Sequence, residues 1–95
     1  MVIYHGIFHV IDGQRPEYIR RIRESGLVEE FTRQRGNVFY TVAASVTNEN
    51  DLIVSDLWES RPDFEGHVSS QAVKDWHKIY HEFVESCEER EYEIE

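Results

Sequence analysis

The order in which strand-like and helix-like patterns follow one another is what most constrains this chain. Apolar residues alternate with a period of two in strands and recur every three or four positions in helices. On this basis the predicted strands cover residues 2–11, 37–46, 52–58 and 91–95, and the predicted helical segments cover residues 16–35 and 64–84. The order strand, helix, strand, strand, helix, strand favours one antiparallel sheet with both helical segments on the same face.

The first predicted strand shows why both faces of that sheet need a cover. One side of it carries Tyr4, Gly6, Phe8 and Val10, and the other side carries His5, Ile7 and His9. Since both sides are mostly apolar or aromatic, the helices would cover one of them, and a second copy of the same sheet is the simplest cover for the other. The sequence therefore predicts an α+β fold of the ferredoxin-like βαββαβ type that forms a homodimer, sheet against sheet.

Proline, serine and glycine mark where the helical segments begin and break. Pro16 suits the first turn of a helix, where its missing N–H would have no partner, and Ser25-Gly26 interrupts the apolar stripe that follows. We therefore expect a bent helix or two short ones there. In the second segment Pro62 lies early in the helix, and Ser69-Ser70 loosen its middle. The charged residues 91–95 suit a short edge strand.

Length and charge limit the partners. At 95 residues the chain has material for one core, so we expect a single domain over residues 1–95. Its formal net charge of −9 would repel a phosphate backbone, so we expect no nucleic acid partner. Apolar runs are short and the N-terminus has no basic start, so we expect a cytoplasmic protein without a membrane partner. The single cysteine, Cys87, has no disulfide partner in the chain, and we expect a small hydrophobe near a helix end.

The second helical segment holds the residues best suited to chemistry. At about 100° per residue, its predicted inner face carries Ala72, Val73, Trp76, Ile79, Tyr80, Phe83, Val84 and Cys87. His77 falls at the inner edge of this stripe, and His81 falls farther out, near the polar boundary. Phe64, His67 and Val68 continue the stripe in the first half of the segment.

His77 and His81 are four residues apart on a helix, which is the spacing of paired metal ligands. The run His-Lys-Ile-Tyr-His lacks the glutamate that zinc proteases carry beside the first histidine. His5 and His9 fall on the face assigned to the dimer, where they would not converge with this pair. We therefore expect no metal site.

His77 and His67 are the candidates for proton transfer, because an imidazole with a pKa of about 6.5 gives and takes protons near neutrality. The competing interpretation is a histidine at the edge of the core that is hydrogen-bonded to a backbone carbonyl. Phe64, Trp76 and Tyr80 are either core residues or the walls of a cleft for a planar ligand. The pattern alone leaves both interpretations open.

Residues 52–73, LIVSDLWESRPDFEGHVSSQAV, carry a resemblance to a known family. A hydrophobic strand ends in Trp-x-Ser and is followed by Phe-x-x-His and Ser, and Gly36-x-x-x-Tyr40 precedes them. In their order and spacing these motifs resemble the antibiotic biosynthesis monooxygenase domain, and the resemblance covers essentially the whole chain. It implies a dimeric α+β barrel, which agrees with the homodimer expected from the strand pattern.

The resemblance also implies a reaction and a site. Members of this family oxygenate polycyclic phenols or quinols with molecular oxygen and without metal, flavin or haem, so we expect a monooxygenase that acts on a small aromatic ligand and uses no cofactor. In that chemistry a polar residue helps to deprotonate the substrate, whose anion then gives an electron to oxygen. By resemblance the pocket lies between helices and sheet, with His77 and His67 as acid or base. Its walls would be Tyr40, Phe64, Trp76 and Tyr80.

Two alternatives stand beside this interpretation. A branch of the same superfamily degrades haem with a histidine ligand on the second helix, a tryptophan one helix segment earlier and an asparagine on the first strand. Here His77 falls at the ligand position, but His67 replaces the tryptophan and Gly6 replaces the asparagine, which favours haem binding over haem breakdown within this alternative. The other alternative is a dimer that binds a small molecule and catalyses nothing.

Overall fold

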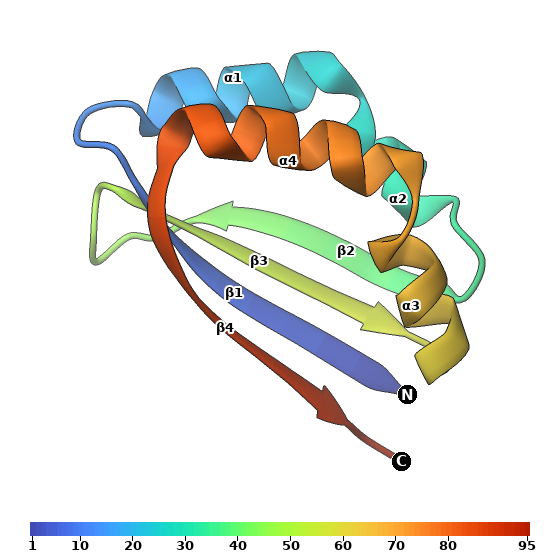
Figure 1. The fold of residues 1–95 in the computed structure, drawn as a ribbon. Coiled ribbons are helices and arrows are strands. Elements are labelled where there is room, and N and C mark those ends of the chain that lie inside the picture. The colour runs from blue at the N-terminus through green and yellow to red at the C-terminus, as the bar shows by residue number, and fades with distance from the viewer.

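The computed structural model describes residues 1–95. Four strands form one antiparallel sheet in the order β2-β3-β1-β4, and the helices lie on one of its faces (Figure 1). In chain order the elements are β1 (Val2–Val10), α1 (Arg15–Ser25), α2 (Leu27–Thr32), β2 (Asn37–Ala44), β3 (Asp51–Trp58), α3 (Arg61–Val68), α4 (Gln71–Phe83) and β4 (Val84–Glu93). The predicted ferredoxin-like α+β fold is confirmed, and the first three strands lie within two residues of their predicted ends.

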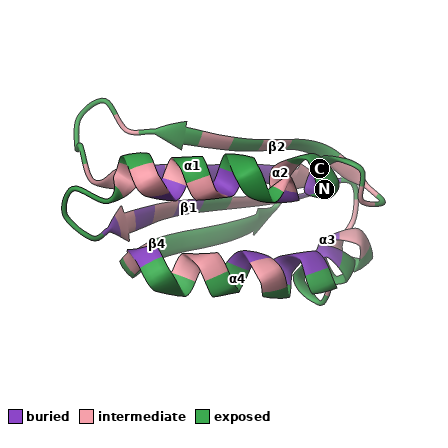
Figure 2. Cartoon of the chain, turned by 90° about the horizontal axis from the view of Figure 1, so that it is seen from above, coloured by how far each residue is buried: buried purple, intermediate pink, exposed green.

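The two central strands, β1 and β3, determine where the core lies. On β3 the buried residues are Leu52, Val54, Asp56 and Trp58, and the residues between them are half-buried. Buried side chains on β1 face the same way, because the two strands pair in register from Val2↔Trp58 to His9↔Asp51. Helices α1 and α4 bury one side against this face and expose the other (Figure 2).

Each predicted helical segment is divided into two helices. Gly26 ends α1 in the left-handed conformation, with φ of +71°, which glycine adopts at little cost. In the second segment α4 begins after Ser70, whose Oγ accepts a hydrogen bond from the Val73 amide at 3.3 Å. Ser60 caps α3 through the Asp63 amide in the same way, so that helix begins at Arg61 rather than at residue 64.

The last strand is much longer than predicted. We expected a strand over residues 91–95 only, whereas β4 runs from Val84 to Glu93 and pairs with β1 along almost its whole length. The prediction was wrong because β4 is mostly charged and lacks the apolar alternation that marks a half-buried strand. The strand is stabilised by its pairing with β1, which the sequence of β4 alone does not indicate.

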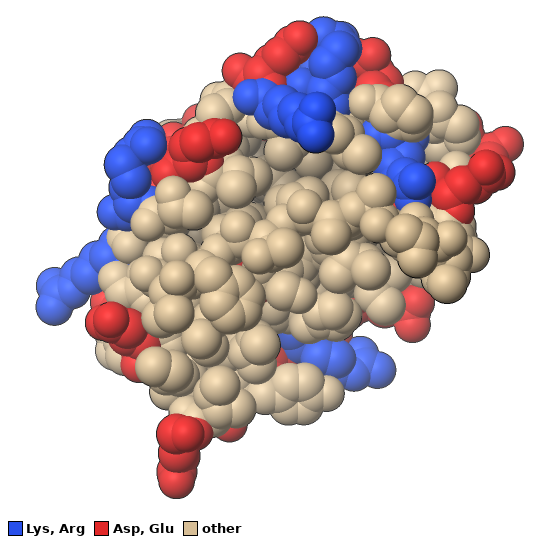
Figure 3. Space-filling view, turned by 180° about the vertical axis from the view of Figure 1, so that it is seen from behind, with Lys and Arg blue, Asp and Glu red and all other residues tan.

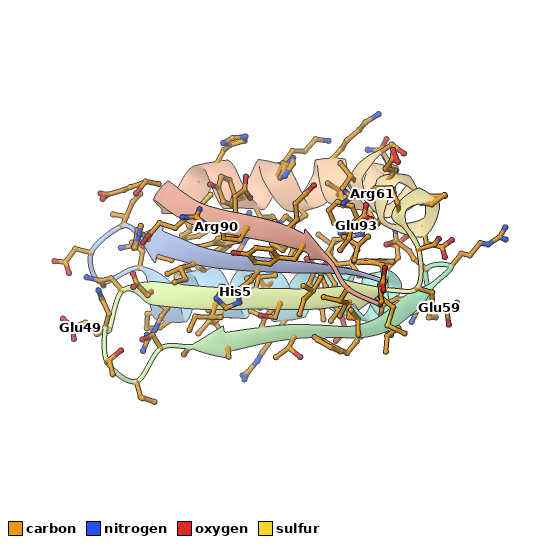
Figure 4. All side chains as sticks on the ribbon, turned by 90° about the horizontal axis from the view of Figure 1, so that it is seen from below. His5, Glu49, Glu59, Arg61, Arg90 and Glu93 are labelled. Atoms are coloured by element: carbon orange, nitrogen blue, oxygen red, sulfur yellow. The ribbon has the colours of Figure 1, made fainter.

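The face of the sheet opposite the helices is open in the single chain (Figure 4). Its half-buried or exposed apolar side chains are Ile3, Ile7, Phe39, Ile53, Leu57 and Tyr92. Among them lies His9, whose Nδ1 is 2.8 Å from Asp51 Oδ1 and whose Nε2 is 2.8 Å from Glu88 Oε2. The hydrogen bond to Asp51, and then that to Glu88, raise the pKa of His9.

Edge strand β2 carries no charged residue. Seen from the side on which β2 lies nearest the viewer, the middle of the molecular surface is uncharged and charged side chains gather around it (Figure 3). None of the helices is long and apolar enough to cross a membrane.

Candidate active site

A pocket of about 480 Å³ lies between the helix-facing side of the sheet and helices α3 and α4. Ten of its 16 lining residues are hydrophobic. The lining includes every site residue predicted from the sequence: Tyr40, Phe64, His67, Trp76, His77 and Tyr80. The structure therefore brings together in one cavity residues that three different elements contribute.

Three neighbouring strands supply the floor of the pocket. Asp56 on β3 pairs with Tyr40 on β2 and with Tyr4 on β1, so the three side chains form one row across the sheet. Tyr4 donates a hydrogen bond from its hydroxyl to Glu89 Oε2 on β4, at 2.6 Å. The row therefore extends to the edge strand and joins the floor of the pocket to its rim.

Asp56 is the functional candidate that sequence reasoning missed. It is only 1% exposed; its Oδ2 accepts a hydrogen bond from Trp58 Nε1 at 2.6 Å, and its Oδ1 has no partner. Burial raises the pKa of Asp56 to about 7, although the hydrogen bond from Trp58 opposes the rise. A signal was present in the sequence, because Asp56 shares the strand phase of the buried residues Leu52, Val54 and Trp58.

His67 is held in one tautomer by its neighbours. Gln34 Nε2 donates to Ser70 Oγ at 3.1 Å, so Gln34 Oε1 faces His67 and accepts a hydrogen bond from Nδ1–H at 2.6 Å. The other ring nitrogen, Nε2, makes no hydrogen bond within the chain and is free to act as an acceptor. Burial, assisted by the nearby His77, lowers the pKa of His67 to about 4, so this imidazole is neutral at neutral pH.

The aromatic rings around His67 fix its plane. Its ring stacks on Trp58 with centroids 4.5 Å apart and planes at 25°, and it meets Phe31 edge-on at 4.8 Å. Phe31 also contacts Tyr40 at 4.8 Å and Trp76 at 5.6 Å. These contacts give the pocket flat, rigid walls.

His77 lies at the rim and is exposed, which corrects the expectation that it is the inner histidine. The buried stripe of α4 consists of Ala72, Val73, Trp76 and Phe83. It is narrower than predicted and is centred near Trp76, so the next residue lies about 100° away from its centre. His67, rather than His77, is the buried imidazole, at 7% exposure.

His81 is also exposed, and its ring lies 6.2 Å from that of His77. No group of three or more histidine, cysteine, aspartate or glutamate side chains is arranged to hold a metal ion.

The phenol groups of the pocket keep their protons at neutral pH. Burial raises the pKa of Tyr40, and the charge of Asp56 raises it further. Burial followed by the hydrogen bond to Glu89 raises the pKa of Tyr4, and burial raises that of Tyr80. These hydroxyls are hydrogen-bond donors rather than bases, which leaves the carboxyl of Asp56 and the free Nε2 of His67 as acceptors.

Comparison with known proteins places the chain in a family. The sequence model of the antibiotic biosynthesis monooxygenases ("Antibiotic biosynthesis monooxygenase") matches residues 1–79. No curated protein matches the chain in sequence.

Solved structures share the fold. A candidate antibiotic biosynthesis monooxygenase from Nitrosomonas europaea superimposes with a TM-score of 0.87 at 15% identity, over 99% of this chain and 98% of that chain. A conserved protein from Methanosarcina mazei Go1 gives 0.87 at 18% identity, over 99% and 92% of the two chains. PA3566 from Pseudomonas aeruginosa superimposes with a TM-score of 0.83 at 12% identity, over 99% of this chain and 94% of that chain. At such low identities the likeness shows a common fold.

Proposed function

Because the chain belongs to the antibiotic biosynthesis monooxygenase family, we propose that it oxygenates a small phenol or quinol with molecular oxygen and uses no cofactor. The observation that carries this proposal is the pocket, in which flat aromatic walls surround two buried groups able to accept a proton, Asp56 and His67. Its volume of about 480 Å³ suits a small planar ligand.

The reaction requires that the substrate hydroxyl lose its proton, since the anion gives up an electron to oxygen more readily than the neutral phenol does. For a phenol with hydrogen on the reacting carbon, phenol and O₂ give a quinone and water. One oxygen atom is joined to carbon, and the other leaves as water with the two hydrogens that the substrate loses. The protein contributes position, exclusion of water and a route for the proton.

His67 and His77 take different parts in this proposal. The free Nε2 of His67 accepts a hydrogen bond from the substrate, because Gln34 holds the proton on Nδ1. His77 lies at the rim and exchanges protons with solvent. Phe64, Trp76, Tyr40 and Tyr80 hold the aromatic ring of the ligand.

The working form in this proposal is a homodimer. The open face of the sheet carries apolar side chains, among them Ile3, Ile53 and Leu57, which a second copy would cover. The pocket lies on the opposite, helix-covered face, so dimer formation leaves its helical walls in place.

Oxygen consumption tests the proposal directly. We expect uptake with some members of a panel of quinols and hydroxylated polycycles, and a loss of about tenfold or more in His67→Gln. His81→Ala, in an exposed residue outside the pocket lining, is the matched control and should keep the wild-type rate. Equal rates in wild type, His67→Gln and His77→Ala would sink the roles assigned to both histidines.

Haem binding is the second candidate, because the exposed imidazole of His77 lines the pocket and makes no hydrogen bond within the chain. The remaining pattern does not fit haem breakdown. A Cβ at Gly6 would lie 2.8 Å from the Tyr4 hydroxyl and 2.9 Å from the Phe8 ring, so an asparagine at this position, as in the haem-degrading branch, would require the Tyr4 and Phe8 side chains to move. Titration with hemin decides the matter: a Soret shift that His77→Ala abolishes supports binding, and an unshifted spectrum removes this candidate.

A further inference from the structure

The carboxyl of Asp56 occupies the centre of the pocket floor, and no residue of the chain uses its second oxygen. Oδ2 accepts a hydrogen bond from Trp58 Nε1 at 2.6 Å, whereas Oδ1 is buried without a partner. A buried polar atom without a hydrogen bond is costly, and such atoms in native proteins call for an explanation. A ligand hydroxyl that donates to Oδ1 would satisfy it.

We propose that Asp56 is the base that takes the proton from the substrate hydroxyl, and that the substrates are uncharged hydroxyarenes. This inference rests on the proposed function for the fate of the substrate anion, but the contact between Asp56 and the hydroxyl does not depend on oxygen chemistry.

Burial reverses the usual order of basicity between the two candidate bases. An exposed histidine is a stronger base than an exposed aspartate. In this pocket burial raises the pKa of Asp56 to about 7 and lowers that of His67 to about 4, because burial disfavours the charged form of each group. The carboxylate is thus the stronger base near neutral pH, and His67 is left to accept a hydrogen bond.

The charged groups at the rim favour an uncharged ligand. Glu89 and Glu91 lie in the lining, and the only permanent cation there is Arg90, whose guanidinium donates to the Glu89 carbonyl at 2.9 Å. The Arg61 guanidinium forms ion pairs with Glu91 at 3.0 Å and with Glu93 at 2.9 Å (Figure 4). The rim therefore carries two carboxylates, Glu89 and Glu91, against one guanidinium, and this excess of negative charge disfavours a ligand carboxylate or phosphate.

The proton step balances within the site. The substrate O–H bond breaks and leaves its electron pair on the substrate oxygen, and an O–H bond forms at Asp56 Oδ1. The phenols of Tyr4 and Tyr40 on either side stay protonated, and His67 does not need to change charge. Molecular oxygen, the oxidant of the proposed reaction, then takes the electron from the anion.

Binding of 4-nitrophenol under anaerobic conditions tests the role of Asp56 without turnover. The absorbance of its coloured anion measures how much anion is bound. The anion binds only when Asp56 is protonated, because an ionised Asp56 would repel it. Above pH 7 the wild-type affinity for the anion should therefore fall about tenfold for each pH unit. In Asp56→Asn, which cannot ionise, the affinity should stay constant, so the variant should bind about 100-fold more tightly than wild type at pH 9.

The same variant should be slow in turnover. We expect oxygen consumption to fall about 100-fold in Asp56→Asn. Asp75→Asn, the same chemical change on the exposed side of α4, should match wild type in both measurements. Tighter binding of the anion together with slower turnover is the signature of a lost base, which a merely structural role would not produce. A thermal melt of Asp56→Asn confirms that the variant is folded.

The outcomes separate this inference from the proposed function. The same pH dependence of binding in wild type and Asp56→Asn would overturn the role of Asp56 and leave the oxygenase proposal standing. A pH-linked difference without oxygen uptake on any hydroxyarene would support the contact with Asp56 and overturn the oxygenase. No binding of the probe to wild type at any pH would overturn the inference.

Discussion

His67 on helix α3, which packs over the covered face of the sheet, and His9 on the open face respond to opposite influences. His67 is buried among aromatic rings and makes one neutral hydrogen bond through Nδ1, and its pKa falls to about 4. His9 lies between the carboxylates of Asp51 and Glu88, which raise its pKa. The comparison shows that the surroundings, more than the residue type, decide which groups of this protein can carry a proton at neutral pH.

Burial on the covered face also shifts the pKa of a carboxyl group, that of Asp56. Asp56 has a tryptophan N–H for a partner and almost no contact with solvent, so its protonated form persists to about pH 7. The covered face therefore favours the uncharged form of both an acid and a base, whereas the open face pairs opposite charges. This contrast predicts that substitutions at Asp56 change the stability of the protein more than a substitution at His9.

Asp56→Asn should stabilise the protein at pH 8. The folded-state pKa is raised from 3.8 to about 7, so stability is greatest below 3.8 and is lost as pH rises to 7. Removing the charge should recover about 2 to 4 kcal/mol of the free energy of unfolding at pH 8, measured by urea denaturation. Asp75→Asn should change it by less than about 0.5 kcal/mol. A less stable Asp56→Asn at pH 8 would contradict the account of the covered face.

The same variant should become sensitive to acid. The lowered pKa of His67 gives stability that is present above about pH 6.5 and is lost as the pH falls toward 4. The raised pKa of Asp56 has the opposite effect, because it gives stability that increases as the pH falls over nearly the same range. The two slopes offset each other in wild type. Asp56→Asn should therefore lose about 2 to 3 kcal/mol between pH 6.5 and 4.

A second substitution checks the origin of that acid sensitivity. The double variant Asp56→Asn/His67→Gln carries neither group and should lose much less stability over the same pH range than Asp56→Asn alone. If acid denaturation curves of the single and double variants coincide, His67 is not the source of the slope.

His9→Gln should have the smallest effect, because its partners are partly exposed. The raised pKa of His9 gives stability that is present below about 6.5 and lost as pH rises through the folded-state value. The variant should lose up to about 1 kcal/mol at pH 6 and much less at pH 9. Equal losses at both pH values would show that the ion pairs with Asp51 and Glu88 contribute nothing measurable.

Much of the fold was predictable from the sequence, because strong alternation on β1 and β3 and the breaks at Gly26 and Ser70 are local signals. β4 was not, since its charged residues form a strand only through pairing with β1. In the site, helical spacing and family resemblance identified six residues that do line one cavity. Asp56 was missed because a carboxylate within an apolar strand reads as a polar interruption, and its burial depends on the helices packed above it.

Helix α4 passes into β4 without a loop, with Phe83 ending one element and Val84 beginning the other. Mechanically this junction is a stiff corner: the Phe83 carbonyl is hydrogen-bonded to the Ile11 amide at 2.8 Å, which anchors the corner to the end of β1. The helix that carries Trp76 and the strand that carries Glu89 therefore cannot separate without disturbing the central sheet. Because the corner limits the separation of these two cavity-lining elements, selection among ligands should follow their thickness and outline.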